Sequence, residues 1–298
     1  MTDRFSVAAR LILLAVLASI TLLPGCGTGP KEPLPGRSPA HAQRIVTLAP
    51  HLAELVFAAG AGQQLVGVSA FSDYPVEATS LPQIGDAFRV DYEALAALSP
   101  DLVLAWTSGN PPALLAQLRD LGYRVVALEP ETLDDVAGQI EFIGELAGTA
   151  AQANAAAGRY RDELTSLRQI YSGRPSIAVF YQVSMRPLLT VSGRQMIGQA
   201  IKLCGGENIF DHQPGLTPVV SLEAVLDAAP AVILAGGALV DDESQLDEWR
   251  RWPMLPANRN GNLFIVDANL MSRPGPRLLD GLRSICSYLD TARYRIQP

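Results

Sequence analysis

The chain has 298 residues, of which 48% are hydrophobic and 18% charged, and its formal net charge is −7. This composition is typical of a globular protein with a full hydrophobic core, and the length indicates two domains. The acidic balance and the lack of a Lys/Arg cluster exclude a nucleic-acid partner, because neutralising phosphates requires a basic patch.

Residues 1–25 have the features of a signal peptide. Two arginines precede an apolar run over 11–23, which is short for a membrane span and typical of a secretory signal. The run ends in LLPGC, which resembles the cleavage region of bacterial lipoproteins and predicts that Cys26 is lipidated; an ordinary signal peptide or anchor is the alternative. Residues 26–43 are rich in Pro and Gly and predict a flexible tether. We therefore expect a periplasmic or extracytoplasmic protein anchored to a membrane as a lipoprotein.

Over residues 44–148, short apolar runs alternate with helical patterns. Because the runs are continuously apolar, they indicate buried parallel strands, and the βα alternation predicts an open α/β lobe. The expected strands are 44–48, 65–69, 102–106 and 124–128, and the expected helices lie near 51–60, 91–98, 112–121 and 132–147.

Residues 149–172 contain no strand signal and are rich in Ala, Arg, Glu and Leu. They predict one connecting helix roughly 35 Å long. The alternation then resumes over 173–298, with strands at 176–183, 231–236 and 262–267 and helices near 195–203, 221–228, 243–251 and 276–292. The predicted fold class is two α/β lobes with mainly parallel sheets, joined by a single long helix.

Two stretches of the chain read almost alike, DYEALAALSPDLVLAW and SLEAVLDAAPAVILAG. In each, a polar N-cap (Asp91 or Ser221) opens a short helix, and a proline separates that helix from a core strand. Chance similarity is the alternative to two related lobes. Glu93 and Glu223 fall in the first helical turn, where a carboxylate complements the helix dipole. Their equivalent placement also suits charge pairs with a two-fold-symmetric partner.

The sequence has no motif for a catalytic nucleophile, a nucleotide-binding loop or a zinc protease. Its three histidines are scattered, and His51, at a helix start, is expected to cap or pack rather than to bind a metal. We therefore expect a binding protein and not an enzyme, with no metal site.

Aromatic and amide side chains follow several strands, at the ends where open α/β sheets bind ligands. Such aromatics suit a large, flat, partly apolar ligand, although core packing is the alternative for each. The candidates are Phe71, Asp86, Phe88, Trp106, Tyr181 and the loop after Trp106, whose Gly109 and Asn110 could present backbone N–H groups.

Cys204 and Cys286 would lie in an oxidising compartment if the chain is exported. A disulfide is the expected state there, and two buried free thiols are the alternative.

Several segments together resemble the cobalamin (vitamin B12) binding proteins of ABC transporters, within the periplasmic binding proteins whose two lobes are bridged by one long helix. The resemblance covers about residues 44–293 and rests on RIVTLAPHLAELVFAAG, VSAFSDYP, DYEALAALSPDLVLAW, LCGGENIF, VSLEAVL and SRPGPR. It implies that the ligand is held between the lobes and passed to a membrane permease. The larger group also binds haem and iron–siderophore complexes.

The resemblance also implies roles for individual residues. Glu93 and Glu223 match the family's docking carboxylates, which face arginines of the permease dimer, and the two cysteines match its disulfide. Phe71 and Trp106 fall where the family has aromatics around the corrin ring, and Arg273 where it has a basic residue near the ligand. The chain departs from the family pattern at Ala87, Phe88 and Thr217, near tryptophans of better-known members, and at Asn269, in place of an aspartate.

We therefore expect an extracytoplasmic solute-binding protein, monomeric and without a resident cofactor, that carries cobalamin or a related corrinoid to an ABC importer. The alternative is a haem or iron–siderophore carrier, which would need an axial Tyr or His, or a basic cluster. A second alternative, an enzyme on the same scaffold, lacks a candidate catalytic group. The expected ligand contacts are Phe71, Asp86, Phe88, Trp106, Gly109, Asn110, Tyr181, Asn269 and Arg273.

Overall fold

The computed structural model of the protein describes residues 41–237 and 243–296. The predicted signal peptide, Cys26 and most of the predicted tether lie outside the described residues. Within the described ranges, no helix combines the length and the apolar character needed to cross a membrane. The described residues all belong to one unit of the chain.

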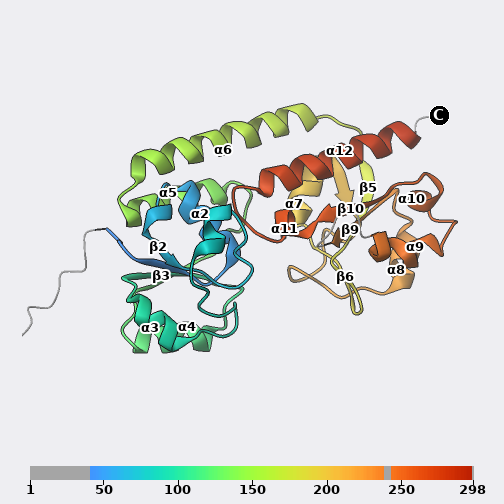
Figure 1. Cartoon of the computed structure of the whole chain (residues 1–298). Helices are drawn as coiled ribbons and strands as arrows, with labels where there is room; N and C mark the ends of the chain where they lie inside the picture. The colour runs from blue at the N-terminus through green and yellow to red at the C-terminus, as the bar shows by residue number, and fades with distance from the viewer. Residues whose placement is uncertain (1–40, 238–242, 297–298) are drawn as a thin grey trace, which may run out of the picture. The chain divides into compact units, whose positions relative to one another are not determined.

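The first lobe is built on a four-stranded sheet in the order β2-β1-β3-β4. All its strand pairs are parallel, and Ile45 of β1 lies opposite both Leu65 of β2 and Leu102 of β3. The strands are β1 Ile45–Thr47, β2 Leu65–Gly67, β3 Leu102–Trp106 and β4 Val125–Leu128. The accompanying helices are α2 Pro50–Ala58, η1 Gly62–Gln64, η2 Val76–Ser80, α3 Tyr92–Leu98, α4 Pro112–Asp120 and α5 Asp135–Ala147. Figure 1 shows α2 and α5 on one side of this sheet and α3 and α4 on the other.

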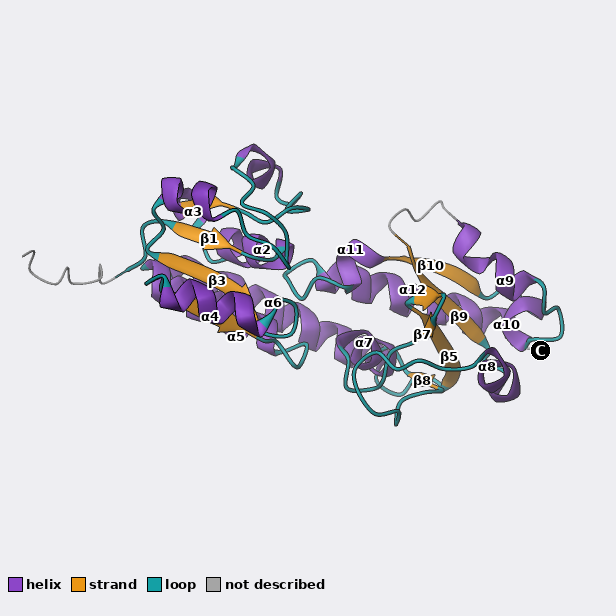
Figure 2. Ribbon diagram, turned by 90° about the horizontal axis from the view of Figure 1, so that it is seen from below, coloured by secondary structure: helices purple, strands orange, loops and turns teal. Residues whose placement is uncertain are grey.

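The second lobe has a parallel sheet in the order β10-β9-β5-β8 and a small antiparallel pair, β6-β7 (Figure 2). Its strands are β5 Ile177–Gln182, β6 Ser184–Met185, β7 Leu188–Leu189, β8 Gly206–Asn208, β9 Val232–Gly237 and β10 Leu263–Asp267. Its helices are α7 Met196–Leu203, α8 Leu222–Ala228, η3 Glu243–Leu246, α9 Asp247–Arg250, α10 Pro256–Arg259, α11 Ala268–Met271 and α12 Leu278–Ile296. The predicted fold class of two mainly parallel α/β lobes is confirmed.

One long helix, α6 (Ala150–Tyr171), connects the two sheets along the chain. Its buried side chains recur every three or four residues and form one stripe: Ala153, Ala157, Tyr160, Leu164 and Leu167. The stripe packs against α5 of the first lobe and against α7 and α12 of the second. Gly144 of α5 allows close approach, since a Cβ there would fall 2.2 Å from the Ala153 Cβ. Small residues thus bring α5 and α6 together.

Burial on both faces explains the continuously apolar strands. In β3, Leu102 and Leu104 belong to a large core that includes α6, whereas Val103 and Ala105 face a separate cluster with α4. Strand β9 alternates in the same way, between the large core and a cluster that contains Trp249. Each sheet is therefore sandwiched between two apolar layers.

The repeated sequence folds into matching helices. Asp91 Oδ1 accepts hydrogen bonds from the backbone N–H groups of Glu93 and Ala94 at the start of α3, both at 3.0 Å. At the start of α8, Ser221 Oγ accepts from the N–H of Ala224 at 3.1 Å. Both expected N-caps are present.

The two helices also end alike. Ser99 and Ala229 close α3 and α8 in the left-handed region, with φ of 46° and 44°. Each directly precedes a proline, which disfavours the right-handed helical conformation in the residue before it. The proline thus ends the helix in both lobes without the glycine that usually occupies such a position.

Some elements differ from the sequence-based expectation. The helix expected near 243–251 is a 3₁₀ turn followed by the single turn of α9, and the strands β6, β7 and β8 were not expected. These three strands are two or three residues long, too short for a periodic pattern to develop.

A disulfide ties α12 to the end of α7. Cys204 and Cys286 are bonded, with their Cα atoms 4.8 Å apart, and both are fully buried. The bond closes a loop of 82 residues, all within the second lobe.

Candidate functional site

A cavity of about 740 Å³ lies where strand ends of both lobes meet. The first lobe contributes residues that follow β3 and β4, and the second contributes residues that follow β5 and precede or begin α7. Its lining is Trp106, Thr107, Ser108, Glu129, Pro130, Glu131, Thr132, Val183, Val191, Arg194, Gln195, Met196, Ile197, Gln199, Leu216, Thr217, Met271, Ser272 and Pro274. Its size is within the range of small-molecule sites, and its place is the usual one in open α/β sheets.

The cavity lining is mixed in polarity and poor in positive charge. Apolar surface comes from Trp106, Met196 and Met271, among others, and hydroxyl or amide groups lie between these side chains. Its ionisable residues within 41–237 and 243–296 are two carboxylates, Glu129 and Glu131, and one guanidinium, Arg194. Such a lining suits a large ligand with apolar faces and many neutral polar groups better than a polyanion.

Trp106 is the one aromatic ring among the described lining residues, and its neighbours hold it in place. Its backbone N–H donates to Asn110 Oδ1 at 2.7 Å, and its indole Nε1 donates to Glu129 Oε1 at 3.4 Å. The ring meets His51 edge to face, with centroids 4.9 Å apart and planes at 83°. Glu129 is fixed in turn by Ser108, whose backbone N–H donates to Oε2 at 2.7 Å. The half-buried indole is thus presented in one orientation.

His51 lies behind Trp106 and is 1% exposed. Burial, and to a smaller extent the positive charge of Arg273, lowers the pKa of His51 to about 3. Its Nε2 has no hydrogen-bond partner among the residues that the structure describes, and the ring does not line the cavity. This setting agrees with the interpretation of His51 as a packing residue.

The neutral state of His51 predicts a pH-dependent stability. The unfolded chain takes up a proton on His51 near pH 6.5, whereas the folded chain does so only near pH 3, so acid favours unfolding. We expect His51 to remove about 1.4 kcal/mol of unfolding free energy per pH unit below about 6.5. Urea titrations of wild type and His51→Leu between pH 7.5 and 5 measure how steeply the free energy of unfolding changes with pH in each protein. His212→Gln, at a 99% exposed side chain, is the control; equal slopes for wild type and His51→Leu would contradict the assignment.

The turn after β3 is built by residues that we expected to contact ligand. Asn110 is 2% exposed, and its Nδ2 donates to the carbonyls of Leu48 at 3.1 Å and Ala87 at 2.9 Å. Its backbone N–H donates to the carbonyl of Trp106 at 2.9 Å, so that group is not free for a ligand. Gly109 lies under the indole, where a Cβ would fall 1.9 Å from the ring. Both residues shape the cavity wall without lining it.

Three other candidates lie in first-lobe loops outside the lining. Phe71 and Phe88 are 76% and 71% exposed, and Phe71 has a φ of 65°, a strained value for a non-glycine residue. Asp86 Oδ1 accepts from the backbone N–H groups of Phe88 and Arg89 at 2.7 and 2.8 Å. Asp86 thus fixes the turn that carries Phe88.

Tyr181 lies in the core rather than at the cavity. It is 2% exposed within β5, and burial raises the pKa of its hydroxyl well above the usual value. The expectation that Tyr181 contacts ligand does not agree with this position. Tyr181 belongs to the sequence IAVFYQ, which forms β5, a central strand of a parallel sheet that is covered on both faces. The Tyr181 ring is therefore buried like most side chains of this strand.

Arg273 and Asn269 lie near the cavity but do not line it. Asn269 Oδ1 accepts from Arg273 Nη2 at 3.0 Å, and Arg273 Nη1 forms an ion pair with Asp73 at 2.5 Å. The residues on either side of Arg273, Ser272 and Pro274, do line the cavity.

Several lining residues were not identified from the sequence. Glu129 directly follows β4 and could have been found by the strand-end argument that selected Trp106. Arg194, Met196 and Gln199 come from the start of α7, and no sequence pattern places this segment beside the first lobe.

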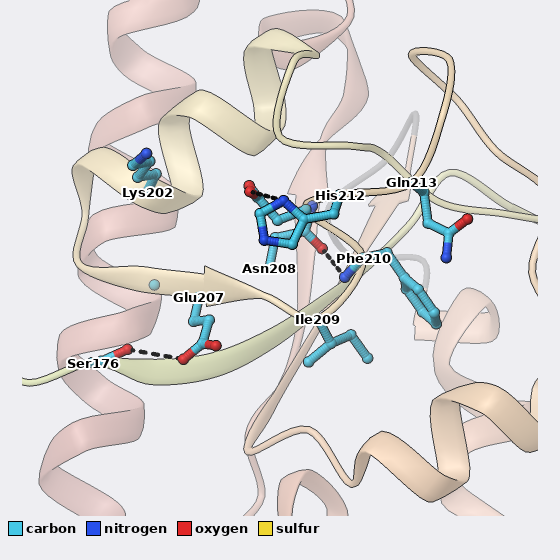
Figure 3. Close-up of a pocket in the computed structure, with 10 residues that line it drawn as sticks. Ser176, Lys202, Glu207, Asn208, Ile209, Phe210, His212 and Gln213 are labelled. Carbon is cyan, nitrogen blue, oxygen red and sulfur yellow. Dashed lines mark hydrogen bonds and ion pairs between the residues drawn. The ribbon is translucent and has the colours of Figure 1, made fainter.

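A second, smaller hollow of about 430 Å³ lies at β8, the edge strand of the second sheet (Figure 3). Two of its polar side chains have local partners, as Figure 3 shows: Ser176 Oγ donates to Glu207 at 3.4 Å, and Asn208 Oδ1 accepts from the backbone N–H of Phe210 at 3.0 Å. The larger cavity lies at the strand ends, where open α/β sheets bind ligands, and is the better candidate site. Across the described residues, no group of three or more His, Cys, Asp or Glu is placed to hold a metal ion.

Comparison with known proteins gives concordant matches. The periplasmic binding protein family matches residues 45–270. A vitamin B12-binding protein of Vibrio cholerae is 36% identical over 256 residues, 86% of this chain and 92% of that protein. One of Pectobacterium carotovorum is 38% identical over 249 residues, 83% of this chain and 88% of that protein.

Solved structures share the fold. The periplasmic vitamin B12 binding protein BtuF of Vibrio cholerae matches with a TM-score of 0.77 at 36% identity, over 85% of this chain and 98% of that one. The periplasmic haem-binding protein HutB of Vibrio cholerae matches with a TM-score of 0.73 at 23% identity, over 83% and 98%. The second likeness concerns the fold alone.

Proposed function

This chain belongs to the periplasmic binding protein family, and on that premise we propose that it captures cobalamin or a related corrinoid and delivers it to an ABC importer. The ligand would occupy the cavity at the strand ends of the two lobes. It is transported cargo, and no catalytic step is assigned. The proposed mature protein is a monomer held at the membrane by a lipid on Cys26.

The chemistry of the cavity is the observation that carries this proposal. Cobalamin has a broad corrin ring edged with neutral amide groups. The ring suits the Trp106 indole and the methionines, and the amides suit the hydroxyl and amide side chains of the lining. Relatives that are 36% and 38% identical are vitamin B12-binding proteins, which supports the same ligand class.

Haem or a ferric siderophore suits this lining less well. An anionic chelate needs several cations, and haem iron generally needs an axial ligand such as His or Tyr. Among the residues that the structure describes, the lining has two carboxylates against one guanidinium and includes no His, Tyr or Cys side chain. Phe71, Phe88 and Arg273 are proposed as additional contacts at the rim, together with the turn held by Asp86.

Delivery is proposed to use Glu93 and Glu223. Both are exposed in the first turn of matching helices, one in each lobe, and pair with no basic side chain in the described structure. A permease dimer with two-fold symmetry would present two equivalent basic patches, so one carboxylate per lobe would orient the carrier.

Replacing Trp106 by alanine is expected to weaken cobalamin binding by about 1 to 3 kcal/mol, because the stacking surface is lost. Calorimetric titration of Trp106→Ala beside Trp252→Ala measures this effect. Trp252 is 37% exposed in the second lobe and lies outside the cavity lining, so its variant should bind as wild type does. Unchanged affinity with lowered stability in Trp106→Ala would reassign the ring to core packing.

The proposed function is tested by titrating the chain from Gly27 to Pro298 with cyanocobalamin, with haem as the comparison ligand. One-to-one binding of cobalamin at micromolar affinity or tighter, without comparable haem binding, is the expected result. Binding of haem and not cobalamin would overturn the proposal in favour of the haem carrier.

A further inference from the structure

Four charged side chains join the two lobes beside the cavity, independently of α6. Glu54 lies on α2 and Asp73 follows β2, both in the first lobe. Arg273 and Arg277 lie between α11 and α12 in the second lobe. We refer to these four residues as the clamp.

The centre of the clamp is a two-point ion pair. Glu54 Oε2 accepts from Arg277 Nε at 3.0 Å, and Glu54 Oε1 accepts from Arg277 Nη2 at 2.6 Å. The Glu54 side chain is 2% exposed and that of Arg277 is 20% exposed. Paired hydrogen bonds of this kind fix both distance and direction, and low exposure to water strengthens them.

A second ion pair, between Arg273 and Asp73, lies beside the pair of Glu54 and Arg277. Arg273 Nη1 lies 2.5 Å from Asp73 Oδ1 and 3.9 Å from Glu54 Oε1, so its charge faces both acids. The Arg277 guanidinium also lies 4.1 Å from the centroid of the Tyr74 ring, within cation–π distance. Two positive and two negative charges thus compensate one another between the lobes.

The clamp holds a wall of the cavity. The segment 271–277 carries both arginines, and its Met271, Ser272 and Pro274 line the cavity. Within it, Gly275 passes so close to Glu54 that a Cβ would fall 3.3 Å from Oε2. The backbone of this wall is therefore held directly against α2 of the other lobe.

A separate contact joins the lobes at another part of the lining. Gln199 of α7 donates through Nε2 to the carbonyl of Glu131 at 2.7 Å, and its Oε1 accepts from the N–H of Leu133 at 3.3 Å. Glu131 and Gln199 both line the cavity. The wall on 271–277 has no part in this contact; its described polar ties to the first lobe are those of the clamp, and Met271 adds apolar packing in the large core.

We propose that Glu54 and Arg277 are positioning residues for ligand binding. Their buried ion pair fastens segment 271–277 to the first lobe and so keeps the cavity, when no ligand is bound, as wide as the ligand requires. This inference rests on the proposed function only in using cobalamin as the probe ligand. Replacing Glu54 leaves the Arg277 guanidinium with only its longer ion pair to Asp73, at 4.0 Å, so the wall loses its closest tie to α2 and can move away from it. A preformed cavity saves the cost of ordering on binding, and a loosened wall shortens the residence of the ligand.

The test compares Glu54→Gln with a control ion pair that does not border the cavity. Glu141→Gln breaks another two-point pair, with Arg161 at 2.5 and 2.6 Å between α5 and α6, at more exposed side chains. Cobalamin association and dissociation are followed by stopped flow. In parallel, spin labels on Ala97→Cys in α3 and Asp227→Cys in α8, both exposed positions, report the distance between the lobes without ligand. The chain carries Cys26→Ser so that only these thiols are labelled.

We expect Glu54→Gln to broaden the inter-lobe distance distribution and to speed cobalamin dissociation by about tenfold, with Glu141→Gln like wild type. If Glu54→Gln does not fold, Asp73→Asn loosens the outer pair at a 57% exposed side chain and should give a smaller change of the same kind. A wild-type distance distribution and dissociation rate in the clamp variants would overturn the inference. Failure of wild type to bind cobalamin would refute the proposed function instead, and the distance measurement would still decide the clamp.

Discussion

Replacing Glu93 and Glu223 together by lysine is expected to abolish transporter-dependent uptake of cobalamin and to leave cobalamin affinity within about twofold of wild type. The two carboxylates are exposed and lie outside the cavity lining, so the ligand should not sense the change. In the proposed docking, a basic patch on each half of the permease would face a lysine in place of a carboxylate, and repulsion across an interface costs several kcal/mol. Uptake by cells and calorimetric titration of the purified variant measure the two effects.

Two control variants distinguish a loss of docking from the effects of changed net charge and of impaired folding. Asp120→Lys with Asp162→Lys makes the same change in net charge at exposed positions on α4 and α6, and should transport normally. Glu93→Gln with Glu223→Gln removes the charges without adding positive ones, and should reduce uptake less than the lysine pair. Each glutamate also complements its helix dipole by about 0.3 to 1 kcal/mol, so thermal unfolding of every variant is recorded. Normal uptake by the lysine pair would refute the docking assignment.

Removing the disulfide by Cys204→Ala and Cys286→Ala is expected to lower the free energy of unfolding by about 4 to 5 kcal/mol in the chain-entropy account. The bond closes a loop of 82 residues, and without it the unfolded chain gains the freedom of that loop. Guanidinium titration under oxidising conditions measures the loss. Cobalamin affinity should stay unchanged below the transition, because neither cysteine lines the cavity.

The reduced wild-type protein separates the cross-link from the packing of the sulfur atoms. It keeps both buried sulfurs and loses only the bond, so it should show most of the same destabilisation as the alanine pair. If reduction lowers stability by less than about 1 kcal/mol, the bond contributes little, and the loss in the alanine variant would come from cavities in the core.

Much of the fold could be predicted because its signals are local. The strands are continuous apolar runs, and Thr149 to Tyr171 lacks any strand signal, so sheet and helix separate along the chain. The repeated Asp91 and Ser221 caps are single-residue signals that need no tertiary information. The strands β6 and β7 pair with each other but are only two residues long, and β8 pairs with β5, where Gly206 lies opposite the distant Ile177.

The site was predictable only in part. Trp106 could be found because it ends a strand beside a turn, where open α/β sheets bind ligands. The same argument selected Tyr181, which the structure places in the core, 2% exposed. Arg194 and Gln199 belong to a segment between strands, and the contact of Gln199 with Glu131 joins residues 68 positions apart. Local pattern carries no information on such pairs.

Each sheet draws its strands from one uninterrupted stretch of chain, β1 to β4 from Ile45–Leu128 and β5 to β10 from Ile177–Asp267. A chain that reaches the compartment where it folds with its N-terminus first can therefore complete the first lobe's sheet before the strands of the second lobe arrive. Cys286 follows β10, so its bond to Cys204 can form only after the described strands of both sheets have arrived. A protein that introduces this bond would thus act at a stage when both sheets can already form.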